Sequence, residues 1–186
     1  IMYKDLYIIT GTNKGLGKAL VDEVFLLDNS SIISIGRTLN EDHVKFLNTL
    51  SDRFHFIKID LNQPALLAEK IDSYHEIMQR TDRIIFINNA GTIAPIEKIG
   101  CINSTKLLAS ININSASPAI ITNRILNKLS GKKLVFINIT SGAAKRPIDG
   151  WAAYCASKSY AKMFFDVLAE QTKDNPRIKV YQIDPG

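Results

Sequence analysis

Three side chains in the second half of the chain have the chemistry of a proton-transfer site. Tyr154 and Lys158 are four residues apart, so on a helix they share one face and their ends can approach. A free tyrosine has a pKa of about 10, too high for proton transfer at neutral pH, and a nearby ammonium favours the phenolate. Ser141 adds a hydroxyl that can donate a hydrogen bond. The alternatives are an ordinary helix surface pair and a turn serine.

A glycine-rich segment near the amino terminus has the features of a phosphate-binding turn. Residues 10–17 read Thr-Gly-Thr-Asn-Lys-Gly-Leu-Gly, between an apolar run and a helical pattern. Glycines there let the backbone approach a pyrophosphate, and the following helix N-terminus offers free N–H groups. A plain strand–helix turn is the alternative, but the placement favours dinucleotide binding. The expected cofactor-binding residues of this turn are Gly11, Thr12, Asn13, Lys14, Gly15, Leu16 and Gly17.

The end of the second apolar run bears on the choice between NAD and NADP. NAD-selective domains hold the adenosine ribose with an acidic side chain at this position. Here the run ends Ile35-Gly36-Arg37-Thr38, without an acid. Arg37 can pair with a 2′-phosphate, and Lys14 is a second candidate for that phosphate. Two solvated surface cations are the alternative, but together with the missing acid they favour NADP(H).

Six short apolar runs are expected to form the strands that position these residues. The runs are Leu6–Thr10, Ile32–Ile35, Phe54–Ile59, Ile84–Ile87, Leu134–Ile137 and Val180–Ile183. They are continuous rather than alternating, which is typical of parallel strands buried on both faces. Their alternation with helical patterns predicts an α/β fold, a doubly wound parallel sheet of the Rossmann type, as a single domain over residues 1–186.

Apolar residues at helical spacing predict amphipathic helices between these strands. The first stripe is Leu16, Leu20, Val24 and Leu27, the second is Leu67, Ile71, Tyr74 and Met78, and the third is Tyr160, Met163, Phe164, Val167 and Leu168. The third stripe follows Tyr154 directly, and we expect it to be the buried face of the helix that carries Tyr154 and Lys158.

In order and spacing, these features resemble the short-chain dehydrogenase/reductase family over the whole chain. The shared motifs are the Thr-Gly-x3-Gly-x-Gly turn, Asp60-Leu61, Asn88-Asn89-Ala90-Gly91, Asn114-Ser115-Ala116-Ser117-Pro118, Ser141, Tyr154-x3-Lys158 and Pro185-Gly186. Within the family, the segments at 114–118, 138–144 and 150–155 look most like bacterial benzil reductases and the related sepiapterin reductases.

The resemblance implies hydride transfer between NADPH and the carbonyl of a ketone or vicinal diketone. It implies that Tyr154 protonates the carbonyl oxygen, that Ser141 donates a hydrogen bond to it, and that Lys158 tunes Tyr154 and holds the nicotinamide ribose. It also implies that Asn114 anchors a water that relays protons to Lys158. A helix cap is the alternative role for Asn114, and Asn112 is a rival by sequence alone.

The resemblance also implies cofactor contacts outside the glycine turn. The residues are Arg37, Asp60, Leu61, Asn89, Ala90, Gly91, Tyr154, Lys158, Pro185 and Gly186. For Asp60 the alternative is a helix N-cap region, since Asn62-Gln63-Pro64 follows and proline suits a first helical turn. Both roles can hold.

The segment Ala143–Trp151 runs between Ser141 and Tyr154 and is expected to border the substrate. Its apolar side chains and the stacking capacity of an indole favour a compact, largely apolar carbonyl compound such as benzil. Packing at the helix start is the alternative for Trp151, and a pterin diketone is the second substrate candidate. A non-catalytic dinucleotide-binding regulator would be expected to lack the Tyr-Lys-Ser set, which is intact here.

Composition limits the partners. The chain has 186 residues, 46% hydrophobic and 22% charged, and its net charge of +5 is spread without a basic block. We therefore expect no nucleic-acid partner, and no apolar run approaches the roughly 18 residues of a membrane span. The start at Tyr3-Lys4-Asp5 is unlike a signal peptide. Cys101 and Cys155 predict free thiols in the cytoplasm and no metal site, and the three histidines are expected at the surface or in packing.

Two further expectations rest on the resemblance. The helices that carry Asn114 and Tyr154 commonly form the family's subunit interface, which implies a homo-oligomer, a dimer or a tetramer. Ala119-Ile120-Ile121 and Phe164-Phe165 are candidates for the apolar patch, with plain core as the alternative. Family members usually continue well beyond the Pro-Gly pair, so the C-terminal part of the family fold is expected to be absent from this chain.

Overall fold

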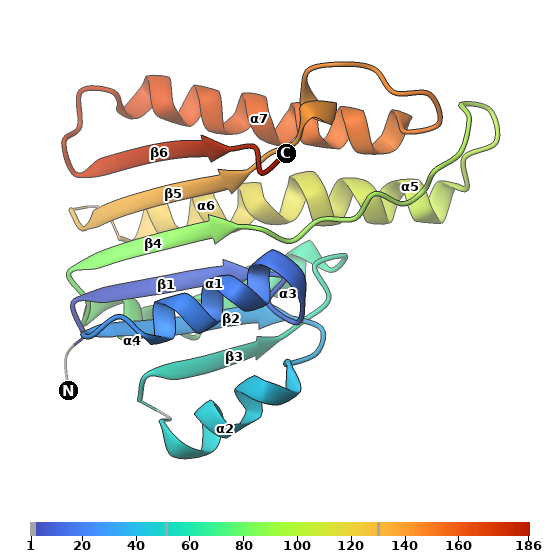
Figure 1. Cartoon of the computed structure of the whole chain (residues 1–186). Coiled ribbons are helices and arrows are strands. Elements are labelled where there is room, and N and C mark those ends of the chain that lie inside the picture. The colour runs from blue at the N-terminus through green and yellow to red at the C-terminus, as the bar shows by residue number, and fades with distance from the viewer. Residues whose placement is uncertain (1–2, 51, 130) are drawn as a thin grey trace.

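The computed structural model describes residues 3–50, 52–129 and 131–186, which form a six-stranded parallel sheet covered by helices (Figure 1). The strands are β1 (Asp5–Thr10), β2 (Ser30–Gly36), β3 (Phe54–Lys58), β4 (Arg83–Asn88), β5 (Lys133–Ile139) and β6 (Ile178–Ile183). Their order is β3-β2-β1-β4-β5-β6, and each neighbouring pair is parallel. The predicted doubly wound α/β fold is confirmed.

Helices cover both faces of the sheet. One face carries α1 (Gly15–Phe25) and α2 (Glu41–Thr49). The other carries α3 (Pro64–Asp72), α4 (His75–Gln79), α6 (Ser117–Lys128) and α7 (Ala152–Thr172). A π-helical turn, η1 (Asn112–Ala116), joins α5 (Ser104–Ile111) to α6, and a short 3-10 turn, η2 (Gly142–Ala144), follows β5. In Figure 1, α1 lies in front of the sheet and α6 behind it.

The continuous apolar runs follow from burial on both faces. Adjacent residues of β1, Ile8 and Ile9, are both fully buried but belong to different core clusters, one on each face of the sheet. Because side chains alternate along a strand, only an unbroken apolar run can supply both clusters. At the edge strand β6 the prediction of two buried faces is wrong. Tyr181 and Ile183 are about half exposed, since α7 covers only the other side of this strand.

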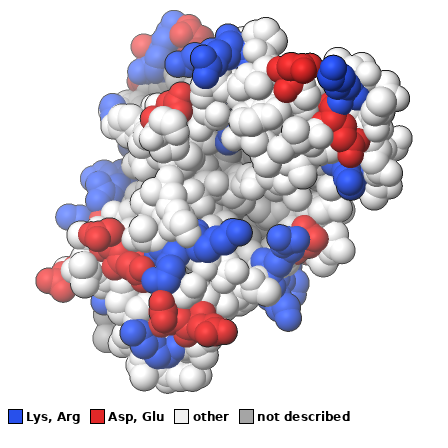
Figure 2. Space-filling model, turned by 45° about the vertical axis from the view of Figure 1, so that its right-hand side comes forward, with Lys and Arg blue, Asp and Glu red and all other residues white. Residues whose placement is uncertain are grey.

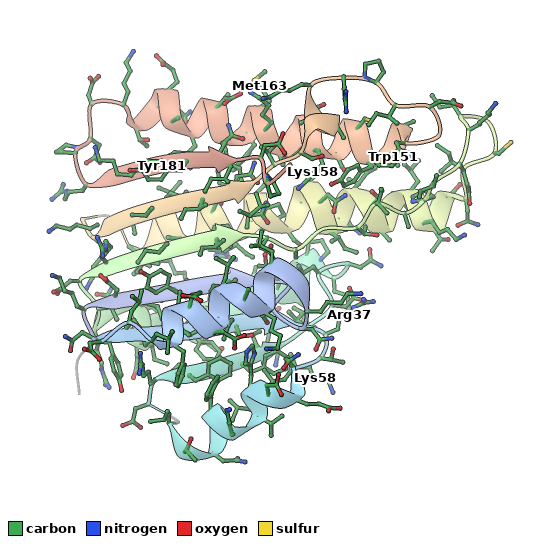
Figure 3. All side chains as sticks on the ribbon, in the orientation of Figure 1. Arg37, Lys58, Trp151, Lys158, Met163 and Tyr181 are labelled. Carbon is green, nitrogen blue, oxygen red and sulfur yellow. The ribbon has the colours of Figure 1, made fainter. Side chains whose placement is uncertain are left out.

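The predicted buried face of α7 is partly wrong. Tyr160, Met163 and Val167 are about half exposed or more, and Figure 3 shows Met163 on the outer side of the helix. Leu168 is buried and Phe164 packs against the core, as predicted. The other buried residues of the helix are Ala153, Ser157, Lys158, Ala161 and Phe165. Apolar residues lie on both sides of this helix, so their spacing alone does not show which side packs on the core. The buried side is the one with the small residues Ala153, Ser157 and Ala161, because these let the helix lie close to its neighbours.

Other helices depart from the predicted stripes in smaller ways. Leu16 is exposed and Leu27 lies beyond the end of α1, while Val24 is buried as expected. The stripe from Leu67 to Met78 spans two helices, α3 and α4, rather than one, although its apolar residues still pack on the core. Helix α2 was not anticipated. Its signal was Asn40 followed by two acidic residues, and the Asn40 side chain caps the helix by accepting from Asp42 N at 2.9 Å.

The apolar patch expected for an oligomer is also partly wrong. Ile121 and Phe165 are fully buried in the core, so they cannot form a surface patch.

In the part of the chain that the structure describes, no helix has both the length and the apolar character needed to cross a membrane.

Candidate active site

Two adjoining cavities lie along the carboxyl edge of the sheet. Loops after β1, β2, β3 and β4 enclose a cavity of about 490 Å³, the glycine-turn cavity, at the point where the strand order reverses. Beside it the loops after β5 and β6, with the start of α7, enclose a cavity of about 460 Å³, the tyrosine cavity. Leu16, Asn89 and Gly91 line both. Figure 2 looks obliquely onto this edge and shows basic side chains beside a hollow.

Two glycines of the turn lie where the backbone is too closely packed for a side chain. Gly11 has φ +73°, and a Cβ there would lie 2.8 Å from Ala90 Cα. A Cβ on Gly17 would collide with the Gly11 carbonyl oxygen. At the start of α1, the N-cap Lys14 makes no side-chain cap hydrogen bond. The close-packed turn and the uncapped helix start fit a dinucleotide pyrophosphate.

The segment after β4 braces this turn. Thr10 Oγ1 accepts hydrogen bonds from Asn89 N at 3.1 Å and from Ala90 N at 3.0 Å. The Asn89 side chain donates in turn to the Gly11 carbonyl at 3.1 Å. Thr12 lines the cavity as well, but its side chain is fully buried and its hydroxyl lies 2.5 Å from the Ser34 hydroxyl. The turn is therefore held rigidly from β2 and β4.

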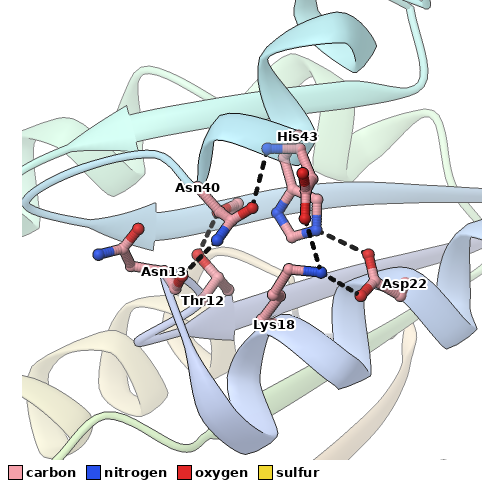
Figure 4. A network of polar contacts seen from close by, with 8 residues as sticks. Thr12, Asn13, Lys18, Asp22, Asn40 and His43 are labelled. Atoms are coloured by element: carbon pink, nitrogen blue, oxygen red, sulfur yellow. Dashed lines mark hydrogen bonds and ion pairs between the residues drawn. The ribbon is translucent and has the colours of Figure 1, made fainter.

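A polar network attaches α2 to the glycine turn (Figure 4). The Asn40 amide donates to the Asn13 carbonyl at 2.7 Å. Lys18 pairs with one oxygen of Asp22 at 2.9 Å, and the fully buried His43 lies 2.8 Å from the other. Partial burial acts to raise the pKa of Asp22, but the hydrogen bonds from Lys18 and His43 bring it below its usual value. His43 is thus a packing residue, and the network fixes the connection between β2 and α2.

The residues expected near the adenosine line the glycine-turn cavity. Arg37 and Lys14 are both exposed and line the glycine-turn cavity from different loops. Asp60 also lines it and accepts a hydrogen bond from Asn62 N at 2.9 Å, two residues ahead of α3, whose N-cap is Gln63. Leu61 lines the same cavity. Sequence reasoning missed the lining residues Gly36, Thr38, Ile59, Thr92 and Ile113.

The tyrosine cavity brings together Ser141, Tyr154 and Lys158 from two different elements. The Ser141 hydroxyl accepts from Ala143 N at 3.2 Å, which leaves its own hydrogen for donation to a ligand. Lys158 is 6% exposed, and its Nζ donates to the Ile139 carbonyl at 2.8 Å. Burial lowers the pKa of Lys158, while the nearby Asp184 carboxylate acts to raise it. Figure 3 shows Lys158 at the carboxyl end of the sheet.

Asn114 lies in the π-helical turn η1 and is almost fully buried. Its amide accepts from Thr92 N at 2.8 Å, and donates to Thr92 O at 2.8 Å and to Ser157 Oγ at 2.9 Å. A Cβ on Gly91 would lie 3.4 Å from Asn114 Oδ1 and 4.0 Å from Lys158 Nζ, so this glycine leaves room between them. The rival Asn112 bonds to Asn62 instead. The structure therefore brings Asn114, and not Asn112, toward Lys158.

The segment between Ser141 and Tyr154 is placed differently from the expectation. Trp151 packs edge-to-face on Tyr154, with ring centroids 5.8 Å apart. Among the described residues that line the tyrosine cavity, neither Trp151 nor Ile148 is included. The cavity is lined instead by Ile93, Ile139 and Thr140, together with Asp184, Pro185 and Gly186. Asp184 was missed although it directly precedes the Pro-Gly pair, because a single acid carries no motif of its own.

Comparisons with known proteins agree with this geometry. The family model for short chain dehydrogenase matches residues 5–186. A benzil reductase ((S)-benzoin forming) of Bacillus cereus is 33% identical over 186 residues, which cover 96% of this chain and 74% of that protein. A sepiapterin reductase of Xenopus laevis is 27% identical over 195 residues, which cover 97% and 72%.

Solved structures show the same fold. A short-chain dehydrogenase/reductase from Burkholderia vietnamiensis has a TM-score of 0.85 at 20% identity, covering 100% of this chain and 85% of that one. A metagenomic short-chain oxidoreductase in complex with NADP has a TM-score of 0.84 at 20% identity, covering 100% and 83%. Because the family match spans nearly the whole chain and the fold agrees, this protein belongs to the short-chain dehydrogenase/reductase family of oxidoreductases.

Proposed function

We propose that this protein is an NADPH-dependent carbonyl reductase that reduces a ketone or vicinal diketone, with Tyr154 as the proton donor. One observation carries the proposal: Ser141, Tyr154 and Lys158 line a single cavity, which shares three lining residues with the glycine-turn cavity. A carbonyl group in the tyrosine cavity would meet a hydroxyl donor, a phenol and a buried ammonium at once.

The glycine-turn cavity is the proposed site of the dinucleotide. Gly11 and Gly17 allow close approach to the backbone, and the uncapped start of α1 offers N–H groups to a pyrophosphate. Arg37 and Lys14 supply positive charge for a 2′-phosphate, which supports NADP(H) over NAD(H). When bound, NADPH supplies the hydride that the carbonyl carbon accepts.

The protein's own groups manage the charge that develops on the carbonyl oxygen. Ser141 donates a hydrogen bond to that oxygen, in the manner of an oxyanion site. Tyr154 gives it a proton, as general acids do. Lys158 is held in place by the Ile139 carbonyl, so its ammonium stays on the side of α7 that carries Tyr154. Asn114, beyond Gly91, is the proposed anchor of a water that returns a proton toward Lys158.

Tyr154→Phe tests the assignment of the proton donor. The change removes only the hydroxyl, so we expect turnover to fall by about 10²–10⁴ while NADPH binding persists. Tyr160→Phe is the matched control, because Tyr160 lies on the same helix with its side chain half exposed. Turnover should be unchanged in that variant. Near-normal turnover in Tyr154→Phe would overturn the role given to this residue.

The proposed substrate is a compact aryl ketone or vicinal diketone such as benzil. Two adjacent carbonyls withdraw electrons from each other and ease hydride attack, and a relative 33% identical to this chain is a benzil reductase. A pterin diketone is the second candidate, supported by sepiapterin reductases among the relatives. Initial rates with NADPH and benzil, phenylpropanedione, sepiapterin or simple sugars decide between them. Turnover of sugars without turnover of diketones would contradict the substrate class.

A dinucleotide-binding regulator without activity is the competing function on this fold. It predicts that NADPH binds with ordinary affinity while none of these carbonyl compounds is reduced. The presence of Ser141, Tyr154 and Lys158 together in the tyrosine cavity supports an enzyme instead.

We also propose a cytoplasmic location, since the two free thiols, Cys101 and Cys155, suit a reducing compartment.

A further inference from the structure

Asp184 is the one acidic residue among the described residues that line the tyrosine cavity, and Lys158 is the one basic residue. Asp184 directly follows β6, so the end of this strand carries it to the site. Its Oδ1 accepts from Gly186 N at 3.3 Å. Its Oδ2 lies 3.9 Å from the position that a Cβ on Gly142 would take. One oxygen is therefore held by the loop of Asp184 itself, while the other faces the turn that begins at Ser141.

The Asp184 carboxylate is the negative charge that the surroundings of Lys158 provide. Lys158 shares the tyrosine cavity with Tyr154 and donates to the Ile139 carbonyl at the end of β5. A Cβ on Gly91 would lie near both Lys158 and the Asn114 amide, which carries no charge. Burial of Lys158 disfavours its charged form, and Asp184 is the charge that opposes this effect. Within the described ranges, no ion pair engages Asp184 elsewhere.

We propose that Asp184 is a positioning residue of this site, which balances the positive charge of Lys158 and selects against carbonyl substrates that carry an anionic group beside the reacting carbonyl. Both effects follow from one negative charge in a cavity of about 460 Å³. A carbonyl that binds Ser141 and Tyr154 shares this cavity with Asp184. A neutral substituent is tolerated there, whereas a carboxylate is repelled. The effect on substrates rests on the proposed function, and the effect on Lys158 does not.

The first test measures Lys158 directly, without cofactor or substrate. In protein labelled at lysine, NMR titration gives the pKa of Lys158, with the resonance assigned by its loss in Lys158→Met. We expect this pKa to fall by roughly half a pH unit or more in Asp184→Asn. The matched control is Asp174→Asn, the same change of charge at an exposed site before β6. An unchanged pKa in Asp184→Asn, with the folded state retained, overturns the proposal.

The second test measures substrate selection. Methyl benzoylformate and benzoylformate share an aryl ketone, but only the second carries a carboxylate beside it. With NADPH, we expect kcat/KM to favour the ester, and Asp184→Asn to reduce that preference by about tenfold. Asp174→Asn should leave the preference unchanged. An equal preference in wild type and Asp184→Asn overturns the selection.

The two tests separate failure of this inference from failure of the proposed function. If neither compound is reduced by any variant, the proposed function and the selection that rests on it both fail. The titration of Lys158 still decides whether Asp184 balances its charge. If both compounds are reduced with an unchanged preference, the proposed function stands and only the selection fails.

Discussion

The proposed preference for NADPH over NADH depends mainly on Arg37. This residue is exposed, follows β2 and lines the glycine-turn cavity together with Lys14. Arg37→Asp replaces an attraction for the 2′-phosphate by a repulsion. We expect the ratio of kcat/KM for NADPH to that for NADH to fall by about tenfold or more.

The control for Arg37 is Arg80→Asp. The side chain of Arg80 is 73% exposed and lies at the end of α4, outside the glycine-turn cavity. This variant should keep the preference for NADPH. A wild-type enzyme that uses NADH as well as NADPH would contradict the assignment of Arg37, whatever the variants show.

At the scale of elements, the π-helical turn η1 positions the site. It inserts extra backbone between α5 and α6, and π-helical turns of this kind are frequent at functional sites. Asn114 in this turn clamps the loop after β4 through both backbone groups of Thr92, and reaches α7 through Ser157. One side chain therefore joins the three elements that border Lys158.

The comparison of Asn114→Ala with Asn112→Ala tests this role. Asn114→Ala leaves buried backbone groups of Thr92 without a partner, which is expected to cost about 1–3 kcal/mol of unfolding free energy. Asn112→Ala removes only a half-buried contact with Asn62 and should cost less than about 1 kcal/mol. Urea denaturation measures both, and initial rates should fall markedly only in Asn114→Ala. Equal losses of stability and of rate in the two variants would contradict the positioning role of Asn114 in η1.

At the scale of the whole molecule, an exposed apolar face spans α5 and α7. Its exposed members are Leu108 and Ile111 on α5 and Tyr160, Met163 and Val167 on α7. A groove of about 390 Å³ runs between the two helices, and Ile111 and Tyr160 line it. Exposed apolar surface of this kind is typical of interaction sites. We therefore keep the prediction of a homo-oligomer and assign its interface to this face, in place of the buried Ile121 and Phe165.

Met163→Asp tests this interface. The side chain is 62% exposed, so the new charge is tolerated in a monomer but would be desolvated between two subunits. Light scattering at micromolar concentration should give the mass of a dimer or tetramer for wild type and a smaller mass for the variant. Leu26→Asp is the control, since Leu26 is 77% exposed at the end of α1 and should not change the mass. A wild-type monomer would refute the prediction.

Local patterns were enough to predict the six strands and the kinds of chemistry, although not every helix. Each of these patterns involves residues that are close together in the sequence: the glycine turn, the pair Tyr154 and Lys158, and each of the six apolar runs. A turn needs its glycines where the backbone bends, and a parallel strand needs an apolar run because both of its faces are covered. The predicted strands accordingly lie within the sheet, and Ser141, Tyr154 and Lys158 line one cavity.

Only the tertiary structure decided which residues meet. It selected Asn114 over Asn112, brought Asp184 opposite the turn at Ser141, and turned Phe165 rather than Met163 toward the core. Each of these outcomes depends on the order of strands in the sheet or on the rotation of a helix about its axis. Both are set by packing between segments far apart in the chain, and a local pattern of residues does not contain that information.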